Sequence, residues 1–143
     1  MAYWVKIRYE RNEYIVNFER VGAFCHEQNG RVTFWLPDSA IPIVINPKSN
    51  VEDYQKILEY IEQVSGLQFE RAYWVRIYYE RNEYVINLDY ISSFCQEPNG
   101  RITFWLPDSS IPIIINPVSN PESYHKVIEY LQRVTGFFYP NEN

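Results

Sequence analysis

The chain carries the same block of sequence twice. Residues 3–66 align without a gap on residues 73–136, and 39 of the 64 aligned positions are identical. The period is longer than that of most solenoid repeats, and two copies are fewer than a solenoid needs. The pattern therefore predicts an internal duplication of one small module. We expect two units, 1–66 and 73–136, joined by a linker at 67–72 and followed by an aromatic tail at 137–143.

Alternation of apolar and polar residues predicts five strands in each unit. The expected strands of the first copy cover residues 3–9, 14–18, 23–28, 31–36 and 40–46. Alternation stops between the second and third strands, where one helical turn or a bend is expected. The Asn-Gly pair at 29–30 favours a tight hairpin turn. Pro42 cannot donate a ladder hydrogen bond, which places the last strand at a sheet edge or a bulge.

A helix is expected at the end of each unit. In the first copy apolar residues recur at intervals of three and four between Asn50 and Gly66, as they do on one face of a helix. The predicted fold class is α+β: a tandem duplication of a small antiparallel β-meander module, closed by one C-terminal α-helix. The two copies are expected to pack with pseudo-twofold symmetry.

The face of each sheet opposite the helix is expected to be rich in aromatic residues. All four tryptophans fall on it by alternation: Trp4, Trp35, Trp74 and Trp105. A module of this size buries too little surface to be very stable by itself, and an exposed apolar face of this extent would be unusually large for a monomer. Two interpretations remain open. Either the two sheets meet face to face or join edge to edge and bury these tryptophans, or the faces stay open for a partner or close only on homodimerisation.

Charge and length restrict the partners and the location of the protein. The net charge is −5, which disfavours an anionic surface as a target and predicts that nucleic acid is an unlikely partner. No apolar run is long enough to span a bilayer, and the start of the chain lacks the apolar core of a signal peptide. A cytoplasmic protein is therefore expected. Cys25 and Cys95 occupy equivalent repeat positions and are expected to be buried free thiols.

The sequence holds no recognisable catalytic or metal-binding motif. It has two histidines, and neither occurs in both copies. We therefore predict no cofactor, no metal and no catalytic residue, and hence a protein that is not an enzyme. Arg31 and Arg101 follow the two Asn-Gly turns and are expected to pair with Glu27 and Glu97 across the hairpins.

The first functional hypothesis is a non-enzymatic protein–protein interaction or adaptor protein, with a protein partner or a second copy of itself. The residues expected to bind are Trp4, Trp35, Trp74, Trp105, Arg31 and Arg101, since tryptophan and arginine are enriched in binding hot spots.

Two alternatives stay open. One is a nucleic-acid binder that uses a local basic stripe among aromatic residues. That stripe would contain Lys6, Arg8, Arg11, Arg31 and their counterparts. The other is a small-ligand binder that uses a cleft between the copies.

The order of apolar segments also resembles known families. One copy runs VKIRYERNEYIVNFERVGAF, then RVTFW, IPIVI and a helix. This is similar to the short flagellar and swarming proteins, which also place an asparagine after the second strand, as at Asn17 and Asn87. It also resembles the LytTR DNA-binding domain and the second half of bacterial PH-like domains. The LytTR resemblance implies DNA binding, which the acidic balance disfavours, and no functional residue is carried over.

Overall fold

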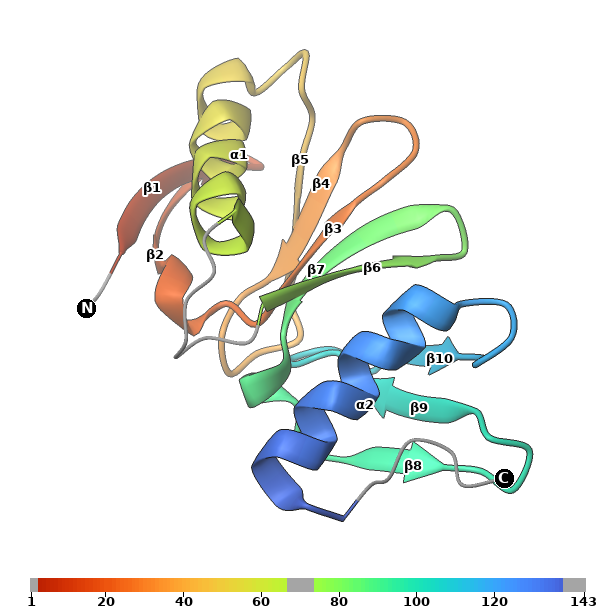
Figure 1. Cartoon of the computed structure of the whole chain (residues 1–143). Helices are drawn as coiled ribbons and strands as arrows, with labels where there is room; N and C mark the ends of the chain where they lie inside the picture. The colour runs from red at the N-terminus through yellow and green to blue at the C-terminus, as the bar shows by residue number, and fades with distance from the viewer. Residues whose placement is uncertain (1–2, 67–73, 138–143) are drawn as a thin grey trace.

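The structure is a computed structural model that describes residues 3–66 and 74–137 (Figure 1). The elements of the first copy are β1 (Trp4–Tyr9), β2 (Asn12–Asn17), the 3₁₀ turn η1 (Phe18–Arg20), β3 (Ala23–His26), β4 (Val32–Trp35), β5 (Pro42–Ile45) and α1 (Val51–Gly66). Those of the second are β6 (Trp74–Tyr79), β7 (Asn82–Asn87), η2 (Leu88–Tyr90), β8 (Phe94–Gln96), β9 (Ile102–Trp105), β10 (Pro112–Ile115) and α2 (Pro121–Thr135). The α+β class, the antiparallel strands and the C-terminal helix are confirmed. The linker at 67–72 and the tail beyond Phe137 lie outside the described residues.

Local sequence explains the turns between these elements. The β1–β2 hairpin turns through Glu10 and Arg11, whose φ angles of 50° and 70° are both positive, as a tight hairpin turn requires. The predicted Asn-Gly turn uses a positive φ of 96° at Gly30. The helical turn expected after the second strand is η1, and the side-chain oxygen of Asn17 accepts a hydrogen bond from the backbone of Glu19 there.

The strands form three antiparallel sheets rather than one sheet per copy. Strands β1 and β2 stand alone, the order β5-β4-β3-β7-β6 makes a central five-stranded sheet, and β10-β9-β8 makes the third. The β6–β7 hairpin of the second copy thus continues the sheet of the first copy through β3. Strand β5, which contains Pro42, lies at the end of its sheet, as does its counterpart β10 with Pro112, so the edge alternative predicted from Pro42 is confirmed.

The junction between the copies differs from the predicted pseudo-twofold packing. Strand β3 of the first copy pairs with β7, which is the counterpart of β2. A twofold axis would pair β8 with β2 in the same way, yet in the described residues each of these strands has a neighbour on one side only. The copies are therefore joined through different surfaces, in a head-to-tail manner.

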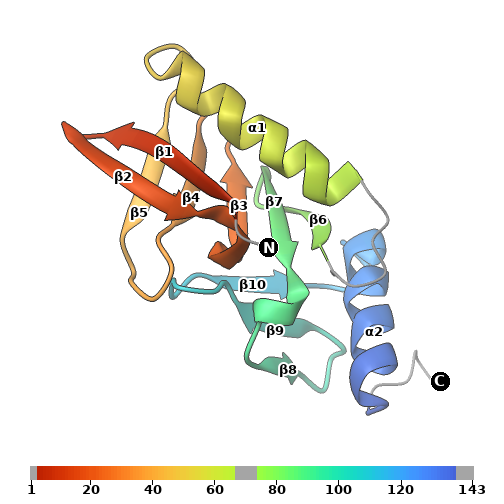
Figure 2. The ribbon, with the colours of Figure 1, turned by 90° about the vertical axis from the view of Figure 1, so that its left-hand side faces the viewer.

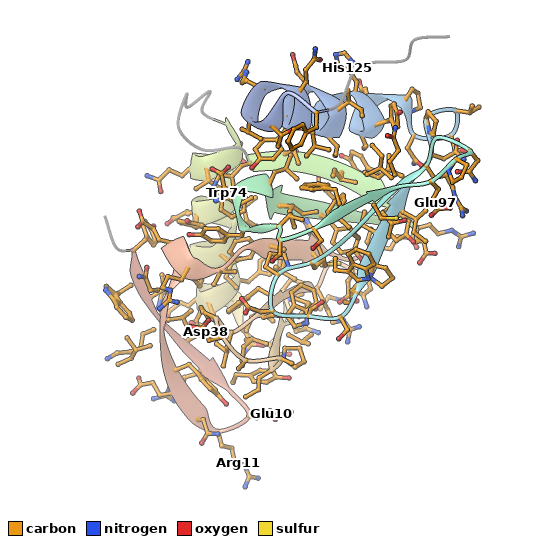
Figure 3. All side chains as sticks on the ribbon, turned by 90° about the horizontal axis from the view of Figure 1, so that it is seen from below. Glu10, Arg11, Asp38, Trp74, Glu97 and His125 are labelled. Carbon is orange, nitrogen blue, oxygen red and sulfur yellow. The ribbon has the colours of Figure 1, made fainter. Side chains whose placement is uncertain are left out.

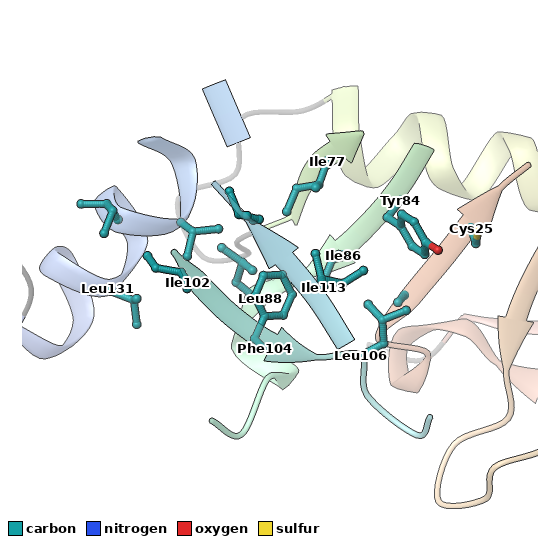
Figure 4. Packing of buried hydrophobic residues seen from close by; sticks show 14 of the residues in the cluster. Cys25, Ile77, Tyr84, Ile86, Leu88, Ile102, Phe104, Leu106, Ile113 and Leu131 are labelled. Carbon is teal, nitrogen blue, oxygen red and sulfur yellow. The ribbon is translucent and has the colours of Figure 1, made fainter. Parts of the chain in front are cut away.

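The central sheet carries a hydrophobic core on each face. On one face the core lies under the β1–β2 hairpin and α1, and it contains Phe18, Phe24, Phe34 and Ile57. On the other face the core lies between the central sheet, the third sheet and α2 (Figures 2 and 4). Strands of each copy contribute to the core of the other, since Val85 belongs to the first cluster and Cys25 to the second. Folding of the two copies is thereby coupled.

The two cysteines have different environments although their local sequences are similar. Both are free, but Cys25 is buried at the junction and Cys95 is exposed on β8. Burial raises the pKa of Cys25 to about 11, against a smaller opposing effect of its hydrogen bond with Tyr84. The prediction of two buried thiols is therefore correct for Cys25 and wrong for Cys95, because no strand among the described residues pairs with β8 at the edge that corresponds to the β3–β7 contact.

We expect iodoacetamide at neutral pH to alkylate Cys95 and to leave Cys25 unmodified in the folded protein. The thiolate is the reacting form, and Cys25 combines burial with a raised pKa. Peptide mass mapping after a short reaction measures this, and denaturant should make both thiols react. Equal alkylation of both thiols without denaturant would contradict the burial of the β3–β7 junction.

Candidate nucleic-acid interface

The β1–β2 hairpin presents an exposed face with cationic and aromatic side chains. Alternation along β1 buries Val5 and Ile7 in the core and leaves Trp4, Lys6 and Arg8 exposed. Trp4 is 63% exposed. Arg11 lies at the tip of the hairpin, where Figure 3 shows it pointing away from the body of the molecule. We call Trp4, Lys6, Arg8 and Arg11, together with Lys56 of α1, the hairpin surface.

Helix α1 lines one side of this surface and fixes the free edge of β1. Lys56 Nζ donates a hydrogen bond to the backbone oxygen of Lys6 at 3.1 Å. The backbone nitrogen of Arg8 donates to Asp53 Oδ2 at 3.0 Å. Between strand and helix runs a shallow, open groove, lined by Lys6, Arg8, Glu13, Ser49, Asn50, Val51, Glu52, Asp53 and Lys56. Two backbone groups on the unpaired edge of β1 therefore form hydrogen bonds with side chains of α1. These bonds hold the cationic residues of β1 in place.

Part of the positive charge on the hairpin surface is compensated locally. Lys6 Nζ lies 3.8 Å from Glu13 Oε2, and Lys56 Nζ lies 3.7 Å from Asp53 Oδ1. Within the described part of the chain, the guanidinium groups of Arg8 and Arg11 have no ion-pair partner. The Lys6–Glu13 pair is exposed and exchanges readily, so Lys6, Arg8 and Arg11 can bind a phosphate oxygen. Asp53 is largely buried, so Lys56 is held more firmly.

The structure does not bring the predicted binding residues together. Trp4 lies on the hairpin surface, whereas Trp35 is only 8% exposed and lies in the core at the junction. Trp74 is half-buried and packs on Phe24, with ring centroids 6.3 Å apart. Trp105, on the outer side of the third sheet, is 43% exposed. The junction therefore covers one tryptophan of each copy, Trp35 and in part Trp74, and leaves Trp4 and Trp105 exposed.

The two predicted arginines are held in hairpin networks away from this surface. Arg31 Nη2 lies 2.8 Å from Glu27 Oε1, and Arg101 Nη2 lies 2.6 Å from Glu97 Oε1, as the sequence predicted. The hydrogen bond from Arg101 lowers the pKa of Glu97. Of the predicted basic stripe, Lys6, Arg8 and Arg11 share a surface and Arg31 does not.

Sequence reasoning missed Lys56. The signal that could have found it is its place one turn into the helix, beside the apolar stripe that packs α1 on the hairpin. Its counterpart Lys126 makes the same contact, with Nζ 3.1 Å from the backbone oxygen of Arg76. A lysine at this position therefore protects the free strand edge in both copies.

Neither a metal-binding cluster nor a membrane-spanning helix occurs in the part of the chain that the structure describes. It contains no group of three or more His, Cys, Asp or Glu residues placed to hold a metal ion. Neither of its helices is long and apolar enough to cross a membrane. Another shallow depression lies at the junction, lined by Arg20, Pro37, Asp38, Tyr90, Ser92, Pro107 and Asp108. The prediction that the chain is not an enzyme stays a prediction.

Comparisons with known proteins give one structural match. No protein-family model matches the chain, and neither does any curated protein. Among solved structures, the LytTr DNA-binding domain of a response regulator from Bacillus cereus matches over 94% of this chain and 97% of that one. The TM-score is 0.48 and the sequence identity 10%. At these values the match does not assign a function.

The match does correct one prediction. The acidic balance of the chain led to the expectation that nucleic acid is an unlikely partner. That expectation is contradicted, because the protein matched over nearly its whole length is named as a DNA-binding domain. Net charge by itself does not exclude a local cationic surface, since it averages over a surface on which cations and carboxylates are unevenly placed.

Proposed function

We propose that this chain is a non-enzymatic nucleic-acid-binding protein, and that the hairpin surface contacts the nucleic acid. The observation that carries the proposal is the placing of Lys6 and Arg8 on one exposed strand face, with Trp4 at the start of that face, Arg11 at the hairpin tip and Lys56 beside the strand. Cationic side chains bind phosphate oxygens, and an exposed tryptophan ring can stack on an unpaired base.

The net charge of −5 is compatible with this proposal because salt screens distant charges. At 0.1 M salt the screening length is about 10 Å, so phosphates at the hairpin surface respond mainly to the groups nearest to them. Glu13 and Asp53 each compete for one lysine. Glu10, Glu52 and Glu59 also line the depressions around the hairpin surface. Arg8 and Arg11 are therefore expected to contribute most of the attraction, and the affinity is expected to be weak and strongly salt-dependent.

We expect the double variant Arg8→Ala/Arg11→Ala to lose most of its affinity for DNA. Binding of a fluorescein-labelled 20-base-pair duplex, followed by fluorescence anisotropy between 20 and 200 mM salt, measures this. Each removed phosphate contact should lower the slope of log K against log salt by about one, so the variant should lose about two. The same measurement with a labelled single strand compares the unmodified protein with Trp4→Ala. If the Trp4 ring stacks on bases, Trp4→Ala should bind the single strand more weakly.

The second copy supplies a matched control. Arg81 occupies the same turn position as Arg11 and has the same φ, 71° against 70°, but lies on the β6–β7 hairpin. Arg81→Ala should bind like the unmodified protein. The proposal fails if the unmodified chain binds neither duplex nor single strand at 20 mM salt. It also fails if Arg81→Ala weakens binding as much as the double variant.

The protein–protein adaptor hypothesis has no support among the comparisons and stays a prediction, as does the cytoplasmic location. The six residues predicted to bind a partner lie on separate parts of the structure, so they do not form one docking site.

A further inference from the structure

The junction inside the chain shows how two copies of the module fit together. Strand β3 pairs with β7 in the register Ala23–Ile86, Phe24–Val85, Cys25–Tyr84 and His26–Glu83. Six of these eight residues are buried, with Phe24 0% and Val85 1% exposed, while His26 and Glu83 at one end are partly exposed. The pairing buries apolar residues on both faces of the central sheet, so each copy provides a surface that the other completes.

The counterparts of both junction strands lie open at the two ends of the molecule. Strand β2 corresponds to β7 and pairs only with β1, while β8 corresponds to β3 and pairs only with β9 among the described residues. Ile15, the counterpart of Val85, is 65% exposed. Cys95, the counterpart of Cys25, is exposed as well. Each molecule therefore carries one unused strand edge of each kind.

We propose that a second copy of this chain docks head to tail, with β8 of one molecule pairing with β2 of the next. Transferring the internal register by one repeat places Phe94 opposite Ile15, Cys95 opposite Tyr14 and Gln96 opposite Glu13. The amide of Gln96 then faces the carboxylate of Glu13. The equivalent pair within the chain is His26 and Glu83, with His26 Nδ1 4.0 Å from Glu83 Oε1. Pairing of edges covers the exposed Ile15 and the ladder groups of both strands.

The internal junction also shows why this contact is weaker between molecules. A Cβ atom on Gly22 would lie 2.5 Å from Cγ of Pro107, so the internal contact depends on the missing side chain. The second copy has Ser92 at this position and Ser93 where the first has the buried Ala23. A neighbouring molecule must therefore shift at Ser92 and bury the hydroxyl of Ser93. Such changes are a known means of restraining edge-to-edge growth.

Sedimentation velocity over a range of protein concentrations tests the proposal. The unmodified chain should show weak, concentration-dependent association. Ser92→Gly/Ser93→Ala, which restores the residues of the first copy, should associate about tenfold more tightly or better. Ile15→Glu should remove the association in both backgrounds. Val118→Glu, which changes an apolar side chain that is 86% exposed on another part of the surface, should have no effect.

A second measurement reports the register directly and works even when association is weak. Tyr14→Cys places a thiol opposite the native Cys95 of the neighbouring molecule, so mild oxidation should give disulfide-linked oligomers on a non-reducing gel. Ser119→Cys, at an exposed position away from the edge, should not. The proposal is overturned if Ser92→Gly/Ser93→Ala associates no more tightly than the unmodified chain. It is equally overturned if Tyr14→Cys gives no more linked product than Ser119→Cys.

Discussion

Replacing Trp35 by alanine is expected to destabilise the fold by about 3–5 kcal/mol, whereas the same change at Trp105 should cost less than half of that. The two tryptophans occupy the same repeat position within the identical segment TFWLPDS. Trp35 is 8% exposed because the second copy covers it, and Trp105 is 43% exposed because nothing in the described structure does. The difference between the two variants therefore measures the contribution of the junction.

Urea unfolding followed by circular dichroism gives both free energies without relying on tryptophan emission. The dependence of the unfolding free energy on denaturant should stay unchanged in both variants, which would show that the comparison concerns stability alone. Equal losses at the two positions would mean that the copies do not bury Trp35 against each other. In that case the arrangement of the central sheet would be wrong.

Replacing Gly22 by serine is expected to destabilise the protein by about 1–3 kcal/mol, the usual cost of an extra group in a packed site. The new Cβ would lie 2.5 Å from Cγ and 2.8 Å from Cβ of Pro107, and 3.0 Å from Cδ2 of Tyr90. Some movement of the Pro107 loop would be needed to accept it. The effect is one of space, since serine is the residue that the second copy carries at the same position without difficulty.

The matched control is Ser92→Ala, which removes a hydroxyl from the exposed counterpart and should change stability by no more than about 0.5 kcal/mol. Thermal unfolding by calorimetry measures both variants. A Gly22→Ser protein as stable as the unmodified one would show that the two copies do not approach closely at Pro107. It would then no longer follow that Ser92, in place of Gly22, weakens the head-to-tail contact between molecules.

The elements of each module follow from local patterns in the sequence. Alternation at Val5 and Ile7 identifies the first strand, Asn29-Gly30 the hairpin, and the three-and-four spacing before Gly66 the helix. These signals can be read from a few residues, because the direction of successive side chains repeats with the period of the strand or helix. The cationic face of β1 was predictable for the same reason, since Lys6 and Arg8 are two residues apart on a strand.

Lys56 and the separation of the predicted binding residues required the fold. A lysine on a helix gives no local sign of the strand that its ammonium group will contact, here at the backbone oxygen of Lys6. Arg31 was grouped with Lys6 from its charge, yet it pairs with Glu27 on a different hairpin.

The sequence by itself determined the duplication, the order of strands and helix in each copy, and the facing of side chains within each strand. Only the tertiary structure decided that β7 pairs with β3 and that β2 and β8 remain at the ends. Two nearly identical segments form the same local structure, so nothing within either copy distinguishes Trp35 from Trp105. Their burial depends on which neighbour covers them, and a linear chain of two head-to-tail units always leaves one surface of each kind uncovered.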